Sequence, residues 1–165
     1  MSFAFLYTRF PEIAERETRS LTVLRDDPVL GLPAADYSFR EMHCEEPGCD
    51  CRRVFFYVTS SLRREVEAVV AWGWETPEFY ARWMRRADPE VVAELIGPVL
   101  NLGSPQSELA PGILKLAKRT LLSDEAYVER VKRHYRLFRD SIDGKANRQG
   151  KRAASKKRKR RKRRR

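Results

Sequence analysis

The sequence has no run of about 18 apolar residues, the length that a membrane-spanning helix needs, so we expect no transmembrane segment. Residues 1–17 include a short apolar run but neither a basic n-region nor a small-residue cleavage site, which argues against a secretory signal peptide. Cysteine is scarce as well, and its odd count of three does not suit a secreted disulfide framework. These absences together predict a cytoplasmic protein.

Acidic residues are absent from residues 151–165, which carry 12 of the 34 Lys and Arg side chains. The other 150 residues hold 22 basic and 23 acidic side chains, so the formal net charge of +11 belongs to the tail. Residues 144–165 are polar, basic and without apolar periodicity, which is typical of disorder. We therefore predict one domain over residues 1–143, followed by a disordered polybasic tail over 144–165.

Strand patterns fill the first half of the chain. Alternation over residues 35–44 places Tyr37 and Phe39 on one face, and period-two spacing over 64–74 places Val66, Trp72 and Trp74 together. Short links between consecutive strands favour hairpins, and hence an antiparallel meander of three to four strands. The expected strands are 19–27, 35–44, 52–61 and 64–74.

Helix signals fill the second half. Thr76 followed by proline is typical of a helix N-terminus, and Asp88 followed by proline repeats the signal. A further helix is expected over 108–122, regular only after its proline, and Ser123 is the expected cap of a helix over 124–142. Strands followed by helices indicate the α+β class, with an N-terminal antiparallel meander packed by C-terminal helices.

The aromatic stretch 72–84 has two interpretations. Trp72 and Trp74 share a strand face, and Phe79 and Trp83 are four residues apart on a helix. This spacing is how a helix packs on a sheet, so we expect these side chains in the core. A surface that stacks on bases or holds a peptide is the alternative.

All three cysteines lie within residues 42–54, with the spacing C-x4-C-x-C around a Pro-Gly turn. Zinc takes four ligands drawn mostly from Cys and His, so three thiolates leave one position to fill. His43 precedes Cys44 directly, and neighbours on a strand point to opposite faces. His134 lies on the apolar stripe of the last expected helix and is the better fourth ligand. The predicted zinc ligands are Cys44, Cys49, Cys51 and His134.

Glu45, Glu46 and Asp50 lie inside the same loop and disfavour free thiolates, because like charges raise a thiol pKa. A bound divalent cation removes that conflict, which favours a metal site over an activated nucleophilic cysteine. Three alternatives stay open: reduced cysteines packed under the sheet, a redox pair, and a Cys/His nucleophile. A hydrolase-type metalloenzyme would use an open metal position with one of these acids as base.

Several segments resemble an uncharacterised bacterial protein family over roughly residues 15–142. They are CEEPGCDCRRV, WGWETPEFYARWM, GPVLNLGSPQSELAPGILKL and LLSDEAYVERVKRHYRLF. Some members of that family carry a C-terminal SEC-C zinc-binding segment after the last of these, where this chain has its basic tail. The resemblance implies a bacterial, cytosolic protein and supplies no activity and no catalytic residues.

We expect the tail to bind polyanions on electrostatic grounds, since dense cations release the counterions of nucleic acid with little sequence preference. The last expected helix adds further basic side chains. A tail that only aids solubility is the alternative. The favoured function is a non-enzymatic protein that binds RNA, DNA or ribonucleoprotein; no membrane or small-molecule partner is indicated. The predicted nucleic-acid-binding residues are Lys151, Arg152, Lys156, Lys157, Arg158, Lys159, Arg160, Arg161, Lys162, Arg163, Arg164 and Arg165.

Overall fold

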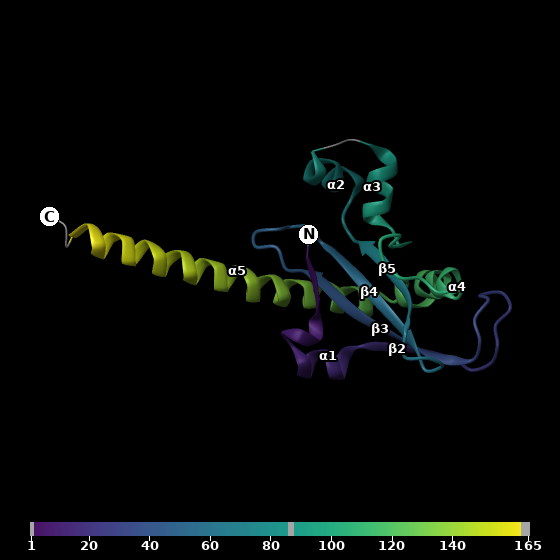
Figure 1. Cartoon of the computed structure of the whole chain (residues 1–165). Coiled ribbons are helices and arrows are strands. Elements are labelled where there is room, and N and C mark those ends of the chain that lie inside the picture. Colours follow the sequence, from purple (N-terminus) through teal and green to yellow (C-terminus); the bar gives the residue numbers. More distant parts are fainter. Residues whose placement is uncertain (1, 86–87, 163–165) are drawn as a thin grey trace.

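Six antiparallel strands form one sheet in the computed structural model, in the order β1-β3-β4-β5-β6, with β2 also paired to β3 (Figure 1). The structure describes residues 2–85 and 88–162, and side chains for 2–85 and 88–144. The predicted α+β class is confirmed. The strands are β1 (Phe3–Phe5), β2 (Arg19–Val23), β3 (Ala35–Cys44), β4 (Arg53–Ser60), β5 (Val66–Gly73) and β6 (Val99–Leu100).

The helices follow the capping signals of the sequence. Thr76 accepts a hydrogen bond from the amide of Phe79 at 3.3 Å, and Asp88 accepts two at the start of α3. One cap differs from expectation: Asp124 Oδ1 accepts from the amide of Tyr127, whereas Ser123 donates to the preceding helical turn. The helices are α1 (Pro11–Glu17), α2 (Pro77–Met84), α3 (Pro89–Ile96), α4 (Ala110–Leu116) and α5 (Glu125–Lys162), with a 3-10 turn η1 (Leu6–Thr8) and a π-helical turn η2 (Ala117–Leu121).

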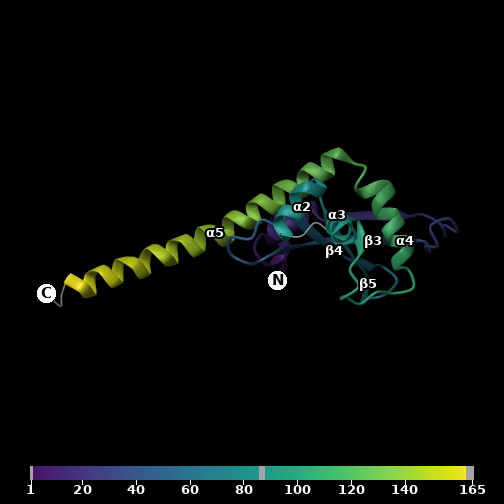
Figure 2. The ribbon, with the colours of Figure 1, turned by 90° about the horizontal axis from the view of Figure 1, so that it is seen from above.

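The core lies between one face of the sheet and the pair α4 and α5 (Figure 2). Tyr37 and Phe39 of β3 are fully buried there, as their alternation predicts. Phe39 lies opposite Val58 of β4, so both strands present the same face to the helices. Tyr127 of α5 tilts against Phe56, with 6.3 Å between ring centroids. The sheet face therefore supports α5, which passes the end of β3 where the cysteines begin.

Three short elements escaped sequence analysis: β1, α1 and β6. β1 pairs with the C-terminal end of β3, with Phe3 opposite Cys44. η1 and α1 then pack on α5, where Leu6, Ala14 and Phe138 form a separate buried cluster. β5 also differs from the expected one-sided strand, because it is buried on both faces along most of its length.

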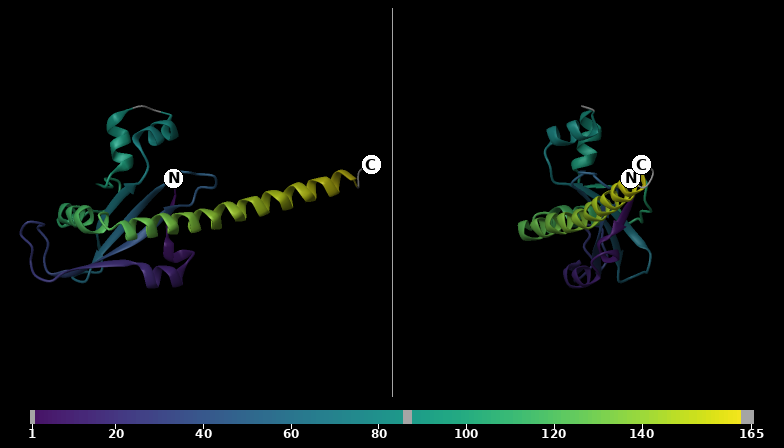
Figure 3. Two further views of the ribbon diagram at one scale, coloured as in Figure 1. Left: turned by 180° about the vertical axis from the view of Figure 1, so that it is seen from behind. Right: turned by 90° about the vertical axis from the view of Figure 1, so that its left-hand side faces the viewer.

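α5 extends away from the sheet beyond its packed part, as two further views show (Figure 3). The described backbone is helical as far as Lys162, over residues for which the sequence predicts disorder. Side chains from residue 145 onward lie outside the described part, so the contacts of residues 145–165 stay a prediction.

Candidate metal centre

The connection between β3 and β4 carries the cysteines. Cys44 is the last residue of β3, and β4 begins at Arg53. The turn between them places Gly48 at φ +73°, where a residue without Cβ is least strained. We call residues 44–52 the cysteine loop. Its short length returns the chain to the sheet with Cys49 and Cys51 beside the end of β3.

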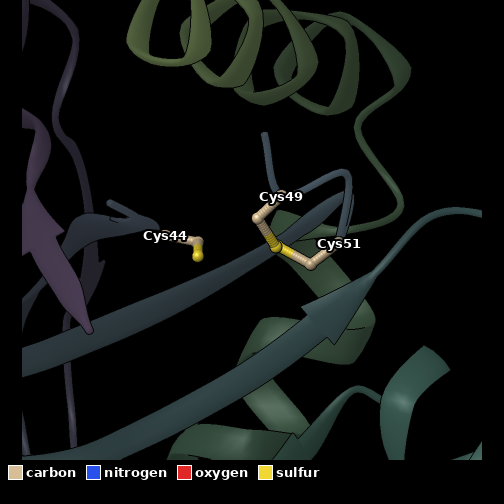
Figure 4. A group of neighbouring side chains, drawn as sticks. All are labelled: Cys44, Cys49 and Cys51. Carbon is tan, nitrogen blue, oxygen red and sulfur yellow. The ribbon is translucent and has the colours of Figure 1, made fainter. Parts of the chain in front are cut away.

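The three thiols lie together, as Figure 4 shows, with all three sulfur atoms within 4.8 Å of one another. Cys44 and Cys51 are buried, Cys49 is half-buried, and all three are free thiols. Zinc–sulfur bonds of about 2.3 Å in tetrahedral geometry separate ligand sulfurs by roughly 3.8 Å. The loop therefore holds its thiols close to the spacing that a shared ion needs. The predicted clustering of Cys44, Cys49 and Cys51 is confirmed.

α5 holds the cysteine loop from one side. Arg139 is only 7% exposed, and its guanidinium donates to the carbonyl oxygens of Cys44 at 3.1 Å and Glu46 at 2.9 Å. Asp143, one helical turn later, accepts from Arg139 and from the amide of Gly48 at 2.9 Å. Main-chain groups of the loop therefore find their partners on one helix, which orients the loop before any ligand arrives.

The end of the loop is held by two tyrosines. Arg52 adopts a left-handed backbone conformation, with φ of 47°, which is uncommon for a residue with a side chain. Its amide donates to the hydroxyl of Tyr135 at 3.2 Å, and its carbonyl accepts from the hydroxyl of Tyr80 at 2.9 Å. These bonds keep the chain reversed at the point where Cys51 turns inward.

Aromatic side chains surround the thiols. Phe3, Trp74, Trp83 and Tyr135 pack on the cluster, and Trp74 meets Tyr135 edge-on with 5.1 Å between ring centroids. Burial in this apolar setting, with the neighbouring thiols, raises the pKa of Cys51 to about 12. Protonated thiols are poor nucleophiles, so the arrangement disfavours a nucleophilic cysteine and fits a metal ligand that loses its proton on binding.

His134 does not join the cluster. Its Nδ1 lies 3.0 Å from a carboxylate oxygen of Glu41, and its Nε2 lies 3.2 Å from Glu17. His43, which directly precedes Cys44, also turns to Glu41, with 3.1 Å between Nε2 and the carboxylate. Within the described residues, the group of neighbouring candidate ligands contains the three cysteines alone. Neither histidine therefore supplies a fourth ligand to the three thiols in this structure.

The buried carboxylate of Glu41 is a feature that the sequence analysis missed. Burial alone raises its pKa, but hydrogen bonds from His134 and His43 outweigh burial and lower that pKa to about 2. A signal was present, because period two puts Glu41 on the same face of β3 as Tyr37 and Phe39. This network ties β3 to α5 and explains why His134 faces inward without a metal role.

Two of the three acidic side chains of the loop are paired with arginines. Glu45 pairs with Arg9 at 2.9 Å, and Asp50 pairs with Arg52 at the same distance. Glu46 is exposed. Since two of these carboxylates already accept from guanidinium groups, they are poorly placed to serve as the base of a metalloenzyme.

Within residues 125–144 of α5, where side chains are described, most of the basic side chains have partners in the domain. Arg130 and Arg133 contact Glu17, Lys132 contacts Glu129, and Arg139 holds the cysteine loop. Arg136 is exposed. The described part of α5 therefore offers little free positive charge, and the predicted nucleic-acid-binding residues 151–165 lie where side chains are not described.

The tryptophans are neither fully buried core residues nor a fully exposed binding surface, the two interpretations made from the sequence. Trp72, Trp74 and Trp83 are half-buried. Trp72 and Trp74 pack on the main core, and their two ring centroids are 5.6 Å apart. Trp83 packs against the cluster that contains Cys44 and Cys51. They therefore contribute to packing, with part of each ring at the surface.

Comparison of the chain with protein-family models, with curated proteins and with solved structures finds no match. The resemblance to a bacterial family with SEC-C members therefore stays a prediction. In the part of the chain that the structure describes, no helix combines the length and the apolar character needed to cross a membrane.

Proposed function

We propose that this chain is a non-enzymatic nucleic-acid-binding protein, in which a thiolate zinc centre supports the base of a polybasic arm, residues 144–165. The arm supplies most of the affinity, with little sequence preference. The zinc centre, at Cys44, Cys49 and Cys51, is structural. Its remaining ligand comes from outside the described residues of this chain.

The observation that carries the proposal is that one helix contacts the cysteine loop and continues into the arm. Tyr135, Arg139 and Asp143 are spaced four residues apart on α5, so they share one face and meet the loop together. The arm begins at Gly144, immediately after the last of them. Metal binding that rigidifies the loop therefore also rigidifies the turn of α5 from which the arm departs.

The charge distribution supports the choice of partner. The domain is near neutral, whereas residues 145–165 contain 14 Lys or Arg side chains and no acidic one. A protein that engages 6–10 phosphates loses about 10³–10⁵ in affinity between 50 and 200 mM salt. A single arm does not engage all its charges at once, so the expected salt slope is below that of full neutralisation.

Deletion of residues 145–165 tests the proposal. The truncated chain keeps Asp143 and every described contact of the cysteine loop, so its unfolding transition should match that of the intact chain. Its affinity for fluorescein-labelled single- and double-stranded oligonucleotides, measured by anisotropy at 50–200 mM salt, should fall to background. If the truncated and intact chains bind equally, the arm is a solubility feature and the proposal fails.

A further inference from the structure

We propose that Cys44, Cys49 and Cys51 also form a binding site for a trivalent thiophilic ion, of which arsenic(III) is the accessible example, held as a three-coordinate trithiolate. The inference deepens the proposed zinc centre and shares with it only these three sulfur atoms. The three thiolates alone fill the coordination shell of an ion of this class.

Ligand number is the first argument. Zinc in structural sites is four-coordinate, and the described residues bring three ligands together. A trivalent arsenic centre makes three bonds to sulfur and keeps a lone pair in place of a fourth ligand. The three thiols therefore complete its shell without His43 or His134, both of which are bound to Glu41.

Charge is the second argument. Three thiolates around a divalent ion leave a net charge of −1, whereas three around a trivalent ion leave none. The surroundings are aromatic, because Tyr135 shares a buried cluster with Cys44 and Cys51, and Phe3, Trp74 and Trp83 pack against that cluster. An uncompensated charge is costly in such a setting.

Two of the nearby cations, Arg52 and Arg139, do not change that balance, and a third, Arg53, donates to the carbonyl oxygen of Glu94 at 3.2 Å. The guanidinium of Arg52 is bonded to Asp50 at 2.9 Å and to Glu75 at 3.0 Å. That of Arg139 is bonded to two carbonyl oxygens of the loop and to Asp143. Since both groups are already neutralised or saturated with acceptors, the neutral complex is the better fit to this cluster of thiols and aromatic side chains.

The reaction balances without any oxidant or reductant. Arsenous acid, As(OH)3, reacts with three thiols; three arsenic–oxygen bonds break, three arsenic–sulfur bonds form, and each hydroxide leaves with a thiol proton as water. Arsenic stays trivalent and sulfur stays divalent throughout. Entry is through Cys49, because it is half-buried at the exposed turn, whereas Cys44 and Cys51 lie behind it.

The test uses the full chain, reduced, in zinc-free and zinc-loaded forms, titrated with sodium arsenite. Trp74 and Trp83 touch the cluster, so their fluorescence reports binding. We expect one arsenic per chain, a mass gain of one arsenic less three hydrogens in native mass spectrometry, loss of all three reactive thiols, and stoichiometric release of zinc.

Three single variants, Cys44→Ser, Cys49→Ser and Cys51→Ser, should each lower arsenite affinity by about 100-fold or more, since changes outside the ligand shell alone cost 10–100-fold. Glu46→Gln is the matched control, because Glu46 is exposed in the same loop and should leave the titration unchanged. The number of thiols that arsenite protects is measured on the unaltered chain. This measurement tests the proposal even if the serine variants fail to fold.

The outcomes separate the two proposals. If zinc binds at one equivalent but arsenite neither displaces it nor protects three thiols, the trivalent site is refuted and the zinc centre stands. Protection of only two thiols, with one still reactive, refutes the trithiolate in favour of dithiol binding. If arsenite binds as expected and zinc does not, the zinc centre fails and the trivalent site stands.

Discussion

Replacing the buried arginine of α5 tests whether the helix holds the cysteine loop. Arg139→Met keeps the length and apolar stem of the side chain and removes its donors. The carbonyl of Cys44 then loses its partner in a buried position, which costs about 1–3 kcal/mol, whereas water can replace the bond to the exposed Glu46. The ion pair with Asp143, whose side chain is 47% exposed, adds about 1 kcal/mol or less.

The expected loss in free energy of unfolding is therefore roughly 1–4 kcal/mol. For a domain of this size, each kcal/mol moves the melting temperature by about 2–4 °C, so the midpoint should fall by roughly 2–16 °C. Zinc affinity, measured by competition with a chromophoric chelator, should drop by about 10–100-fold, as it does when groups that orient ligands are removed.

Arg136→Met is the control for this experiment. Arg136 lies on the same helix three residues earlier and is exposed, so its replacement should change stability by no more than about 0.5 kcal/mol. Equal unfolding midpoints and equal zinc affinities for Arg139→Met and the unaltered chain would refute the view that α5 orients the thiols.

Two further predictions concern other parts of the domain. Glu41→Gln should destabilise the fold at neutral pH by on the order of 3 kcal/mol, because the folded-state pKa of about 2 lies below the ordinary 4.5. This stabilisation is lost as pH falls through that interval, so urea titrations should show the two proteins converging between pH 4.5 and 2; a constant difference would contradict it. Trp74→Ala should cost about 2–3 kcal/mol in urea unfolding, less than a fully buried tryptophan, since the ring is half-buried against Tyr135. A variant of normal stability that binds oligonucleotides less tightly would instead make Trp74 a binding residue.

The sequence by itself determined the features that depend on near neighbours in the chain. The alternation over 35–44 placed Tyr37 and Phe39 in the core, and the Thr76 and Asp88 caps began two helices where expected. The spacing of the cysteines around a Pro-Gly turn was enough to bring three thiols together, because a short loop cannot separate them. Each of these follows from local geometry, which a short stretch of residues specifies.

Only the tertiary structure decided which residues far apart in the chain contact one another. His134 faces inward, as its apolar stripe predicts, but its partners are Glu41 and Glu17, which lie 93 and 117 residues away in the chain. β1 has only three residues, too few for a periodic signal, and it forms because the edge of β3 is available beside Cys44. In the sequence, Arg139 is likewise one of several basic residues of a helix. Only the packing shows that it is buried against the cysteine loop. Pairings of this kind depend on where α5 crosses the sheet, and that crossing is set by the whole core.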